Sequence, residues 1–442
     1  MKIFNKNISF RKEHGVAIFF ILFLTRLFYL LVVTLNKGFS KEGWNITEFL
    51  INYEGGFVRR GLTGELLLKL YQLFHIDVYW TIIIVCLIAY VLLAVFFVKG
   101  FVKKGLPVFI LPFVFFLGGP IIQEFLIRKD ILLALLFILV LRFSLKKTVI
   151  APIIANLLLI LAILIHETAG FYAFPVLILI YLHKYKSLFS KGSYVKAGLL
   201  SCLTLLPSVY MFLAVIHFHG DAGVARSIWD SWGSVPFLFQ DGSVPISAID
   251  AIAWSLKDTA ILTWDYLLMA RSAGIVGIIA WCVILPSIYY VLSNSNKLDF
   301  PLLGHRPSMS FNPSLLSSLL IMQFITVFPL FCIAMDYGRW IFNWVVSTFI
   351  IFLVLPEKNL SAIIPSWISA ASREISRFLN TLAGNSRGVV ALICMMISFP
   401  YFKWDFLYTA TTNSVVIVLQ FISMLVAEMA GRLGIFVSEI VI

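Results

Sequence analysis

The sequence has little charge for its length. Only 13% of its 442 residues are Asp, Glu, Lys or Arg, whereas 61% are hydrophobic. A typical soluble domain is about 25% charged and about 45–50% apolar. A soluble fold could not cover so much apolar surface, so the composition excludes a soluble enzyme, a disordered chain and a secreted disulfide scaffold. It predicts a polytopic membrane protein.

Motifs for metal binding and disulfide formation are also lacking. The five cysteines lie inside apolar runs, without a CxxC pair or a Cys/His cluster. Neither a zinc site nor a disulfide framework is therefore expected. His166-Glu167 is not followed by the second histidine of HExxH, which excludes that class of metalloprotease. We expect no cofactor and assign no metal ligand, and a divalent metal is left open.

The N-terminus lacks a small-x-small cleavage site. Basic residues between Lys2 and Lys12 precede an apolar run from Gly15 to about Val33. That run is too long for a typical signal-peptide core. We interpret it as a retained signal anchor with its N-terminus in the cytoplasm.

Apolar runs of bilayer-spanning length recur along the chain. A helix that crosses about 30 Å of hydrocarbon needs about 20 apolar residues. We predict an all-α fold, a polytopic transmembrane helical bundle of about 12 spans (10–13) with interfacial amphipathic helices, forming a single integral membrane domain over residues 1–442. The predicted spans are residues 15–36, 78–98, 107–123, 130–145, 149–165, 169–182, 197–217, 272–293, 314–335, 340–355, 388–402 and 413–431.

The positive charge supports one orientation of these spans. The chain has 34 Lys and Arg against 22 Asp and Glu, a net charge of +12. With the N-terminus inside, most basic residues fall in loops assigned to the cytoplasm, as the positive-inside rule requires. Membrane topology therefore explains the positive net charge without nucleic-acid binding. We predict a multi-pass protein of the bacterial inner membrane. Residues 356–387 are expected to form a cytoplasmic amphipathic segment on membrane lipids. Arg26, inside the first span, needs a partner, and Glu428 is a weak candidate.

The first outer loop, residues 37–77, carries the most informative pattern. Glu54 precedes two glycines, which allow a sharp turn. Arg59 and Arg60 then present two guanidinium forks, a geometry suited to phosphate or pyrophosphate. From Gly61 to Phe74 apolar residues recur at helical spacing, which predicts an interfacial helix. The alternative is that both arginines only reach lipid headgroups and that Glu54 pairs with one of them.

Other outer hairpins also place acids beside bases. His166-Glu167 can relay a proton or orient a hydroxyl, although a histidine at a span end is often structural. Arg128-Lys129-Asp130 and Asp336 with Arg339 are either ion pairs or parts of a site around a shared anionic ligand. Glu124 lies close to the first of these groups.

The outer loop of residues 218–271 combines tryptophan with aspartate. Loops of this length are usually functional or disordered, and the aromatic residues argue against disorder. Tryptophan beside aspartate suits sugar recognition, because the ring stacks on a pyranose while the carboxylate accepts hydrogen bonds from hydroxyls. An interfacial aromatic belt is the alternative.

This pattern resembles bacterial membrane glycosyltransferases of the GT-C type and O-antigen or capsular polysaccharide polymerases. The residues that carry the resemblance are the first-loop acid, Glu54 or Glu48, followed by an interfacial helix, and the scattered outer arginines of a bundle with one long outer loop. It implies an outer active site and a lipid-pyrophosphate donor. In the GT-C pattern a first-loop acid acts as base or metal ligand, which corresponds to Glu54. The usual adjacent second acid is absent here. In the polymerase pattern arginines hold pyrophosphate, which corresponds to Arg59, Arg60, Arg128 or Arg339.

We therefore expect a glycosyltransferase that polymerises surface-polysaccharide repeats carried on polyprenyl (pyro)phosphate. Its expected partners are the polyprenyl-linked oligosaccharide and membrane lipids, without nucleic acid, and no oligomeric state is assigned. The candidate catalytic residues are Glu54, His166 and Glu167. The candidate substrate-binding residues are Arg59, Arg60, Glu124, Arg128, Lys129, Asp336 and Arg339.

The alternative is a transporter or flippase of a lipid-linked sugar or another anion. Arg26 and the Gly118-Gly119-Pro120 break favour it, because transporters use charged sites near the midplane and broken helices. The absence of a sequence repeat and the position of the charges at span ends favour the enzyme.

Overall fold

The computed structural model describes residues 12–37, 43–117, 119, 126–189, 193–235, 244–269, 272–298, 311–334 and 336–397. All regular elements within these ranges are helices, which confirms the all-α class. The first half contains α1 (Lys12–Lys37), α2 (Trp44–Leu50), α3 (Gly61–Phe74), α4 (Val78–Lys104), η1 (Val108–Ile110), α5 (Leu111–Phe116), α6 (Asp130–Ser144), α7 (Ile150–Ile165), α8 (Thr168–Lys186) and α9 (Tyr194–His217). The second half contains α10 (Ala222–Ser231), α11 (Ser247–Asp250), η2 (Ala251–Ala253), α12 (Leu256–Met269), α13 (Ser272–Ser293), η3 (Ser295–Leu298), α14 (Pro313–Ile333), α15 (Tyr337–Val354), α16 (Glu357–Ile363), α17 (Ser366–Ala383) and α18 (Arg387–Ile397).

Five of these helices are long and apolar enough to cross a membrane. They are α1, α4, α9, α14 and α15, and three shorter apolar stretches lie at Ile150–Ile165, Trp281–Ser293 and Arg387–Ile397. The chain is therefore a membrane-embedded helical bundle. The total of about 12 spans stays a prediction, and the predicted span 413–431, with Glu428, lies outside the described residues.

The predicted span 107–123 is wrong for the part that the structure describes. Residues 108–116 form the short turn η1 and the six-residue helix α5. Six residues rise only about 9 Å, far less than the about 30 Å of hydrocarbon. Pro107 precedes η1 and Pro112 lies in the first turn of α5, where proline is tolerated, and α5 ends at Leu117, whose backbone is extended.

The helix α15 forms the centre of the bundle. It contacts α4, α5, α6, α8 and α14, and nearly all of its residues are buried. Arg339, Asn343 and Ser347 follow one another at intervals of four residues, so they share one face of this helix. Arg339 and Asn343 meet Asp130 of α6, and the Ser347 hydroxyl donates to Gln323 Oε1 of α14 at 3.1 Å. A polar stripe thus runs from one end of the bundle into its interior.

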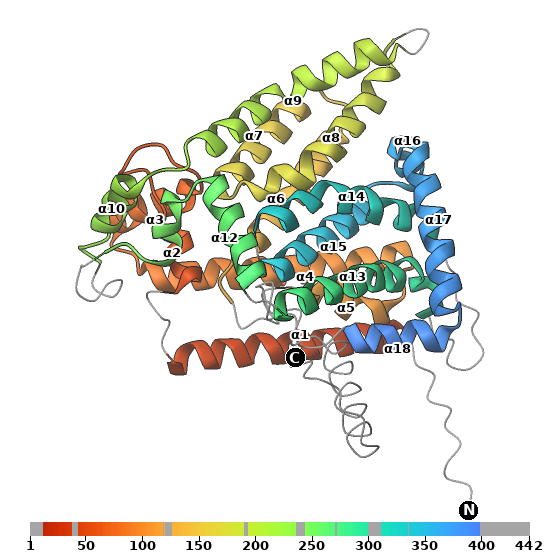
Figure 1. Cartoon of the computed structure of the whole chain (residues 1–442). Helices are drawn as coiled ribbons and strands as arrows, with labels where there is room; N and C mark the ends of the chain where they lie inside the picture. Colours follow the sequence, from red (N-terminus) through yellow and green to blue (C-terminus); the bar gives the residue numbers. More distant parts are fainter. Residues whose placement is uncertain are drawn as a thin grey trace, which may run out of the picture.

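Polar helices gather at the two ends of the bundle. Figure 1 shows α2, α3, α10 and α12 at the left end of α4, α14 and α15, and α16 and α17 at the right end. The predicted segment 356–387 is largely helical, and α17 exposes Trp367, Phe378 and Leu382 while burying Ile368.

The predicted long loop 218–271 is mostly helical in its described residues. Its elements α10, α11 and η2 pack with α2 and α3 into a unit that we call the cap, whereas α12 packs against α13 and α14. The Trp232 indole N–H donates to the Leu50 carbonyl at 2.8 Å, and Asn52 Nδ2 donates to Ser231 Oγ at 2.8 Å. The Ala248 N–H donates to Thr47 Oγ1 at 3.1 Å. These bonds join segments about 180–200 residues apart in sequence.

We expect Gly64→Ala to destabilise the cap. A Cβ atom at Gly64 would lie 2.1 Å from the Ile51 carbonyl oxygen, so α3 would have to move away from the end of α2. The control is Gly198→Ala in α9, where a Cβ meets nothing within 4 Å. Thermal unfolding in detergent should show a lower melting temperature for Gly64→Ala and an unchanged or higher one for Gly198→Ala. Equal melting temperatures would contradict this packing.

Candidate functional site

A buried carboxylate, Glu48 of α2, lies where four parts of the chain meet. Its side chain is inaccessible to solvent. One oxygen, Oε1, lies 3.3 Å from His166 Nε2 and 3.5 Å from Arg339 Nη2, and the other, Oε2, lies 3.4 Å from Arg128 Nη1. Buried charges are stable only when they are paired. The burial of α2 therefore depends on residues before α6, after α7 and in α15.

Arg339 connects this carboxylate to two others. Its Nε donates to Asp130 Oδ1 at 2.8 Å, and its Nη1 lies 3.5 Å from Asp336 Oδ2. Asn343, one turn further along α15, places Nδ2 3.4 Å from Asp130 Oδ1. A guanidinium held by three carboxylates has little capacity left for a further anion.

Arg60 forms the second ion pair of the site. Its Nε lies 3.0 Å from both carboxylate oxygens of Glu167, and its Nη2 also contacts Oε1. Lys129 lies beneath this pair, where its Nζ donates to the Arg60 carbonyl at 3.1 Å and lies over the Phe49 ring. Arg60 adopts a left-handed conformation with φ of 65° just before α3. That local turn aims its side chain across the site.

The backbone fixes the tautomer of His166. The Thr168 N–H donates to His166 Nδ1 at 3.2 Å. A backbone N–H can only donate, so Nδ1 is the acceptor and the ring proton lies on Nε2, facing Glu48. Burial, together with the positive charges of Arg60 and Arg339, lowers the pKa of His166 to about 4. His166 is therefore neutral, its Nε2 lies 3.3 Å from Glu48 Oε1, and its lone pair on Nδ1 is already used.

Burial and neighbouring charges set the other ionisation states. Burial alone would raise the pKa of Glu48 and Glu167, but Arg339 and Arg60 respectively hold each pKa well below its usual range. Burial lowers the pKa of Lys129 to about 7. Glu48 and Glu167 are consequently ionised at neutral pH and are weak bases.

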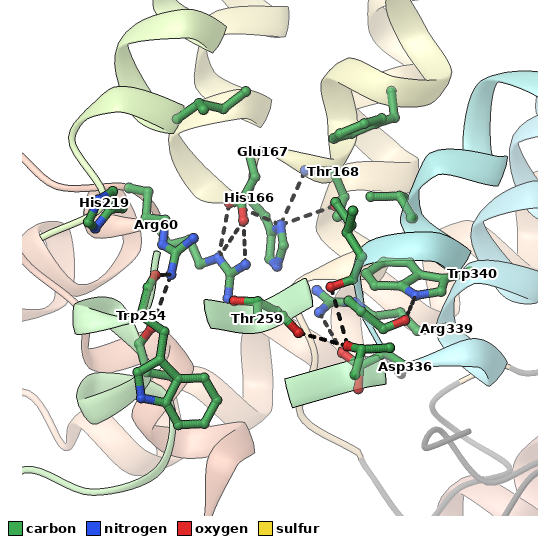
Figure 2. Close-up of a pocket in the computed structure, with 18 of the residues that line it drawn as sticks. Arg60, His166, Glu167, Thr168, His219, Trp254, Thr259, Asp336, Arg339 and Trp340 are labelled. Atoms are coloured by element: carbon green, nitrogen blue, oxygen red, sulfur yellow. Dashed lines mark hydrogen bonds and ion pairs between the residues drawn. The ribbon is translucent and has the colours of Figure 1, made fainter. Parts of the chain in front are cut away.

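The charged residues border a cavity of about 180 Å³, which we call the cap cavity. Figure 2 shows Arg60, His166 and Glu167 on one side of it and Asp336, Arg339 and Trp340 on the other. Trp44 and Trp254 also line it, with ring centroids 6.4 Å apart. Pockets that enclose a whole small molecule usually measure about 300–1,000 Å³. The cap cavity thus suits the reacting end of a larger substrate.

Arg59 lines the cap cavity and, among the described residues, has no carboxylate oxygen within ion-pair distance, although Glu167 acts on its charge at longer range. Its Nη2 donates to the carbonyls of Ala251 and Trp254, each at 3.0 Å, and its buried Nε has no hydrogen-bond partner there. Burial and the neighbouring Arg60 lower its pKa to about 10, so it stays protonated at pH 7. A buried charge without a counterion is costly. An anion in the cap cavity would relieve that cost.

His219 lies next to Arg59 at the cavity wall. The Arg59 N–H donates to the Phe218 carbonyl at 3.0 Å, which ties the end of α9 to the first loop. His219 lines the cap cavity, and its buried Nδ1 has no hydrogen-bond partner among the described residues. Gly220 follows with φ of +92°, and a Cβ atom there would lie 2.2 Å from Ile252. This turn therefore requires glycine and fixes the histidine beside the cavity.

Comparison with known proteins identifies no relative. No family model, no curated protein and no solved structure matches the chain. The function of the cap cavity must therefore be argued from its own chemistry.

The structure brings most of the sequence-predicted residues together. Arg59, Arg60, His166, Glu167, Asp336 and Arg339 line the cap cavity, and Arg128 and Lys129 lie behind it, tied to Glu48 and to the Arg60 carbonyl. Glu54 lies apart: its side chain is 39% exposed and its oxygen is 3.5 Å from Lys69 Nζ. The first-loop acid inside the cluster is Glu48 instead. Glu124 lies outside the described residues.

Sequence reasoning missed His219, Trp44 and Thr259 of the cavity wall. Their signals were weak, because a single histidine, tryptophan or threonine in a loop has no characteristic spacing. Among the residues that the structure describes, no group of three or more His, Cys, Asp or Glu side chains is placed to hold a metal ion.

We expect Glu48→Gln to destabilise the fold far more than Glu54→Gln. The first change removes the common counterion of Arg128 and Arg339 in a buried site, where breaking a pair typically costs about 3–5 kcal/mol. The second removes an exposed pair worth about 0–1 kcal/mol. Denaturant unfolding in detergent micelles measures both. Similar losses for the two variants would contradict the central position of Glu48.

The neutral state of His166 predicts a pH dependence. Its folded pKa of about 4 lies below the ordinary value of about 6.5, so the unfolded chain takes up a proton first. Stability should fall as the pH decreases from about 6.5 to 4. His166→Asn, which keeps a donor but does not titrate, should show a flatter melting temperature across this window. Parallel curves for both proteins would exclude a neutral His166.

Proposed function

We propose that this protein is an integral-membrane glycosyltransferase that acts on sugars linked to polyprenyl pyrophosphate and polymerises repeat units of a surface polysaccharide. The observation that carries the proposal is Arg59, a buried cation with no carboxylate oxygen within ion-pair distance among the described residues, facing a cavity bordered by tryptophan rings. The proposal places this cavity at the outer face of the bacterial inner membrane, with about 12 spans and a cytoplasmic N-terminus.

The division of charge in the cluster supports an anionic substrate. Arg60, Arg128 and Arg339 are each held by carboxylates of the chain itself. Arg59 is held only by backbone carbonyls, which orient its guanidinium without neutralising it. A pyrophosphate at this position would gain charge-assisted hydrogen bonds. The resemblance offers four arginines for binding the pyrophosphate leaving group. We assign this role to Arg59.

The uncharged residues of the cavity wall support a sugar. Trp44 and Trp254 offer flat apolar surfaces, and the hydroxyls of Thr168 and Thr259 line the same cavity. A pyranose has an apolar face that can lie on an indole ring and hydroxyls that can bond to neighbouring polar groups. The combination suits a sugar phosphate better than a simple inorganic anion.

The arrangement also supports a proton acceptor other than the predicted ones. His166 uses its lone pair on the Thr168 N–H, and both oxygens of Glu167 bind Arg60. His219 has a free buried nitrogen at the cavity. In the proposed step the acceptor hydroxyl attacks the anomeric carbon, the bond from that carbon to the pyrophosphate oxygen breaks, and the hydroxyl proton passes to His219. Arg59 stabilises the charge on the departing lipid pyrophosphate.

The opposite end of the bundle supports the proposed orientation. There the Lys104 ammonium donates to the Leu355 carbonyl at 2.8 Å, and the Lys184 ammonium donates to the Lys146 carbonyl at 2.7 Å. Lysines thus gather at the end remote from the cap cavity. Cytoplasmic loops carry such an excess of basic residues.

Elongation of a lipid-linked oligosaccharide by the purified protein tests the proposal. Arg59→Gln should lower the rate at least a hundredfold, because removal of one group that stabilises developing charge costs about 10²–10³ in kcat. The matched control is Arg226→Gln in α10, where the arginine is exposed and pairs with Asp230. Normal elongation by Arg59→Gln at equal protein level would contradict the proposal. Movement of the lipid across the membrane without bond formation would show a flippase instead.

His219→Asn should lower the rate about 10²–10⁴-fold, the usual contribution of a general base. His217→Asn is the control, because His217 is an exposed neighbour that does not line the cavity. An unchanged rate in His219→Asn would assign the proton transfer to another group.

A further inference from the structure

A second cavity lies beside the cap cavity and has a different character. It has a volume of about 490 Å³, and its wall is formed by side chains of α12, α13, α14 and the first residue of α15. Eight of these eleven side chains are aromatic or aliphatic. We call it the side cavity. Its volume lies in the range that encloses a whole ligand, although none of the described residues that line it is charged.

The two cavities adjoin at Thr263. This α12 residue lines both, and its hydroxyl donates to the Thr259 carbonyl at 2.9 Å, which leaves its methyl group for apolar contact. Of two adjacent residues, Asp336 lines the cap cavity and Tyr337 lines the side cavity. The two cavities therefore share Thr263 as a common part of their walls.

The side cavity extends from the cap end toward the middle of the bundle. On α14 it reaches from Cys332 to Phe324, whereas Ile333 lines the cap cavity. From Cys332 to Phe324 the helix rises about 12 Å. This is close to one leaflet of a hydrocarbon layer about 30 Å thick. The cavity thus has the depth of a single leaflet.

The rim of the side cavity is accessible from outside the bundle. Trp264 is 52% exposed and Phe328 is 48% exposed. The inner wall is rigid, because the rings of Trp281 and Phe331 pack on Tyr337 at 4.9 and 5.2 Å between centroids. A long flexible chain could therefore enter sideways from the bilayer and lie against a preformed wall.

We propose that the side cavity binds the hydrocarbon chain of the polyprenyl substrate while its phosphate group lies against Arg59 in the cap cavity. This inference rests on the proposed function and assigns the part of the protein that selects the lipid. An amphiphile with one long chain fits the layout, because an apolar cavity of one-leaflet depth adjoins a cavity that contains an uncompensated cation. A two-chain anionic phospholipid is the competing occupant, and the test distinguishes it.

Binding of three probes to the full-length protein in detergent tests this assignment. The probes are undecaprenyl phosphate, inorganic pyrophosphate and phosphatidylglycerol. Leu285→Trp fills the side cavity from α13 and should weaken undecaprenyl phosphate at least tenfold without changing pyrophosphate binding. Arg59→Gln should weaken both. Leu213→Trp, at an exposed position of α9 outside both cavities, is the matched control and should weaken neither.

The cysteines provide a second measurement that needs no substitution. Cys282, which is exposed, and Cys332, which is half-buried, line the side cavity, whereas Cys202 is exposed on α9 outside both cavities. Undecaprenyl phosphate should slow the alkylation of Cys282 and Cys332 at least fivefold and leave Cys202 unchanged. Equal protection by phosphatidylglycerol, or protection of Cys202 as well, would overturn the assignment.

The binding assay and the elongation assay test two different proposals, so either proposal can be rejected while the other is kept. Selective protection of Cys282 and Cys332 without elongation would keep the lipid site and reject the transferase. Elongation that Leu285→Trp leaves unchanged, with undecaprenyl phosphate still bound at full affinity, would keep the transferase and reject the side cavity as the chain site.

Discussion

The buried carboxylate of Glu48 is the interaction on which the cap depends. A carboxylate with no access to water needs counterions and hydrogen-bond donors, and Glu48 obtains them from Arg128, Arg339 and His166. Each donor belongs to a different part of the bundle, so the short helix α2 is fixed relative to α6, α7 and α15 at once. The neutral state of His166 follows from its burial, to which the positive charges of Arg60 and Arg339 add.

The ion pairs of the site leave the Arg59 guanidinium available for a ligand. The strongest guanidinium–carboxylate contacts, between Arg60 and Glu167 and between Arg339 and Asp130, serve the structure. Arg59 is oriented by two carbonyls and retains its charge for a ligand. The functional charge is thus the one that the fold does not neutralise. With the adjoining side cavity, the site has a charged part and an apolar part, as an amphiphilic substrate requires.

Much of this could be predicted from the sequence. The apolar composition fixes a helical membrane protein, and the placement of acids and bases at span ends predicts a shared charged site. The sequence analysis chose Glu54 instead of Glu48, because both acids belong to the first loop and only the three-dimensional packing shows that Glu48 is the buried one. His219 was missed because its role depends on Arg59 and Gly220, which bring the end of α9 to the first loop. The prediction of a span at residues 107–123 was wrong because it relied on hydropathy, which does not show where a helix ends.

The central claim is that Arg59 binds the phosphate of the lipid substrate. The most direct test is to determine the structure of the complex with a polyprenyl pyrophosphate. The account predicts a phosphate oxygen about 2.7–2.9 Å from the Arg59 guanidinium, the usual length of a charge-assisted hydrogen bond, with the first isoprene units passing Thr263. A phosphate bound at the lysine-rich end of the bundle, or at the cap with the Arg59 guanidinium turned away from it, would contradict the account.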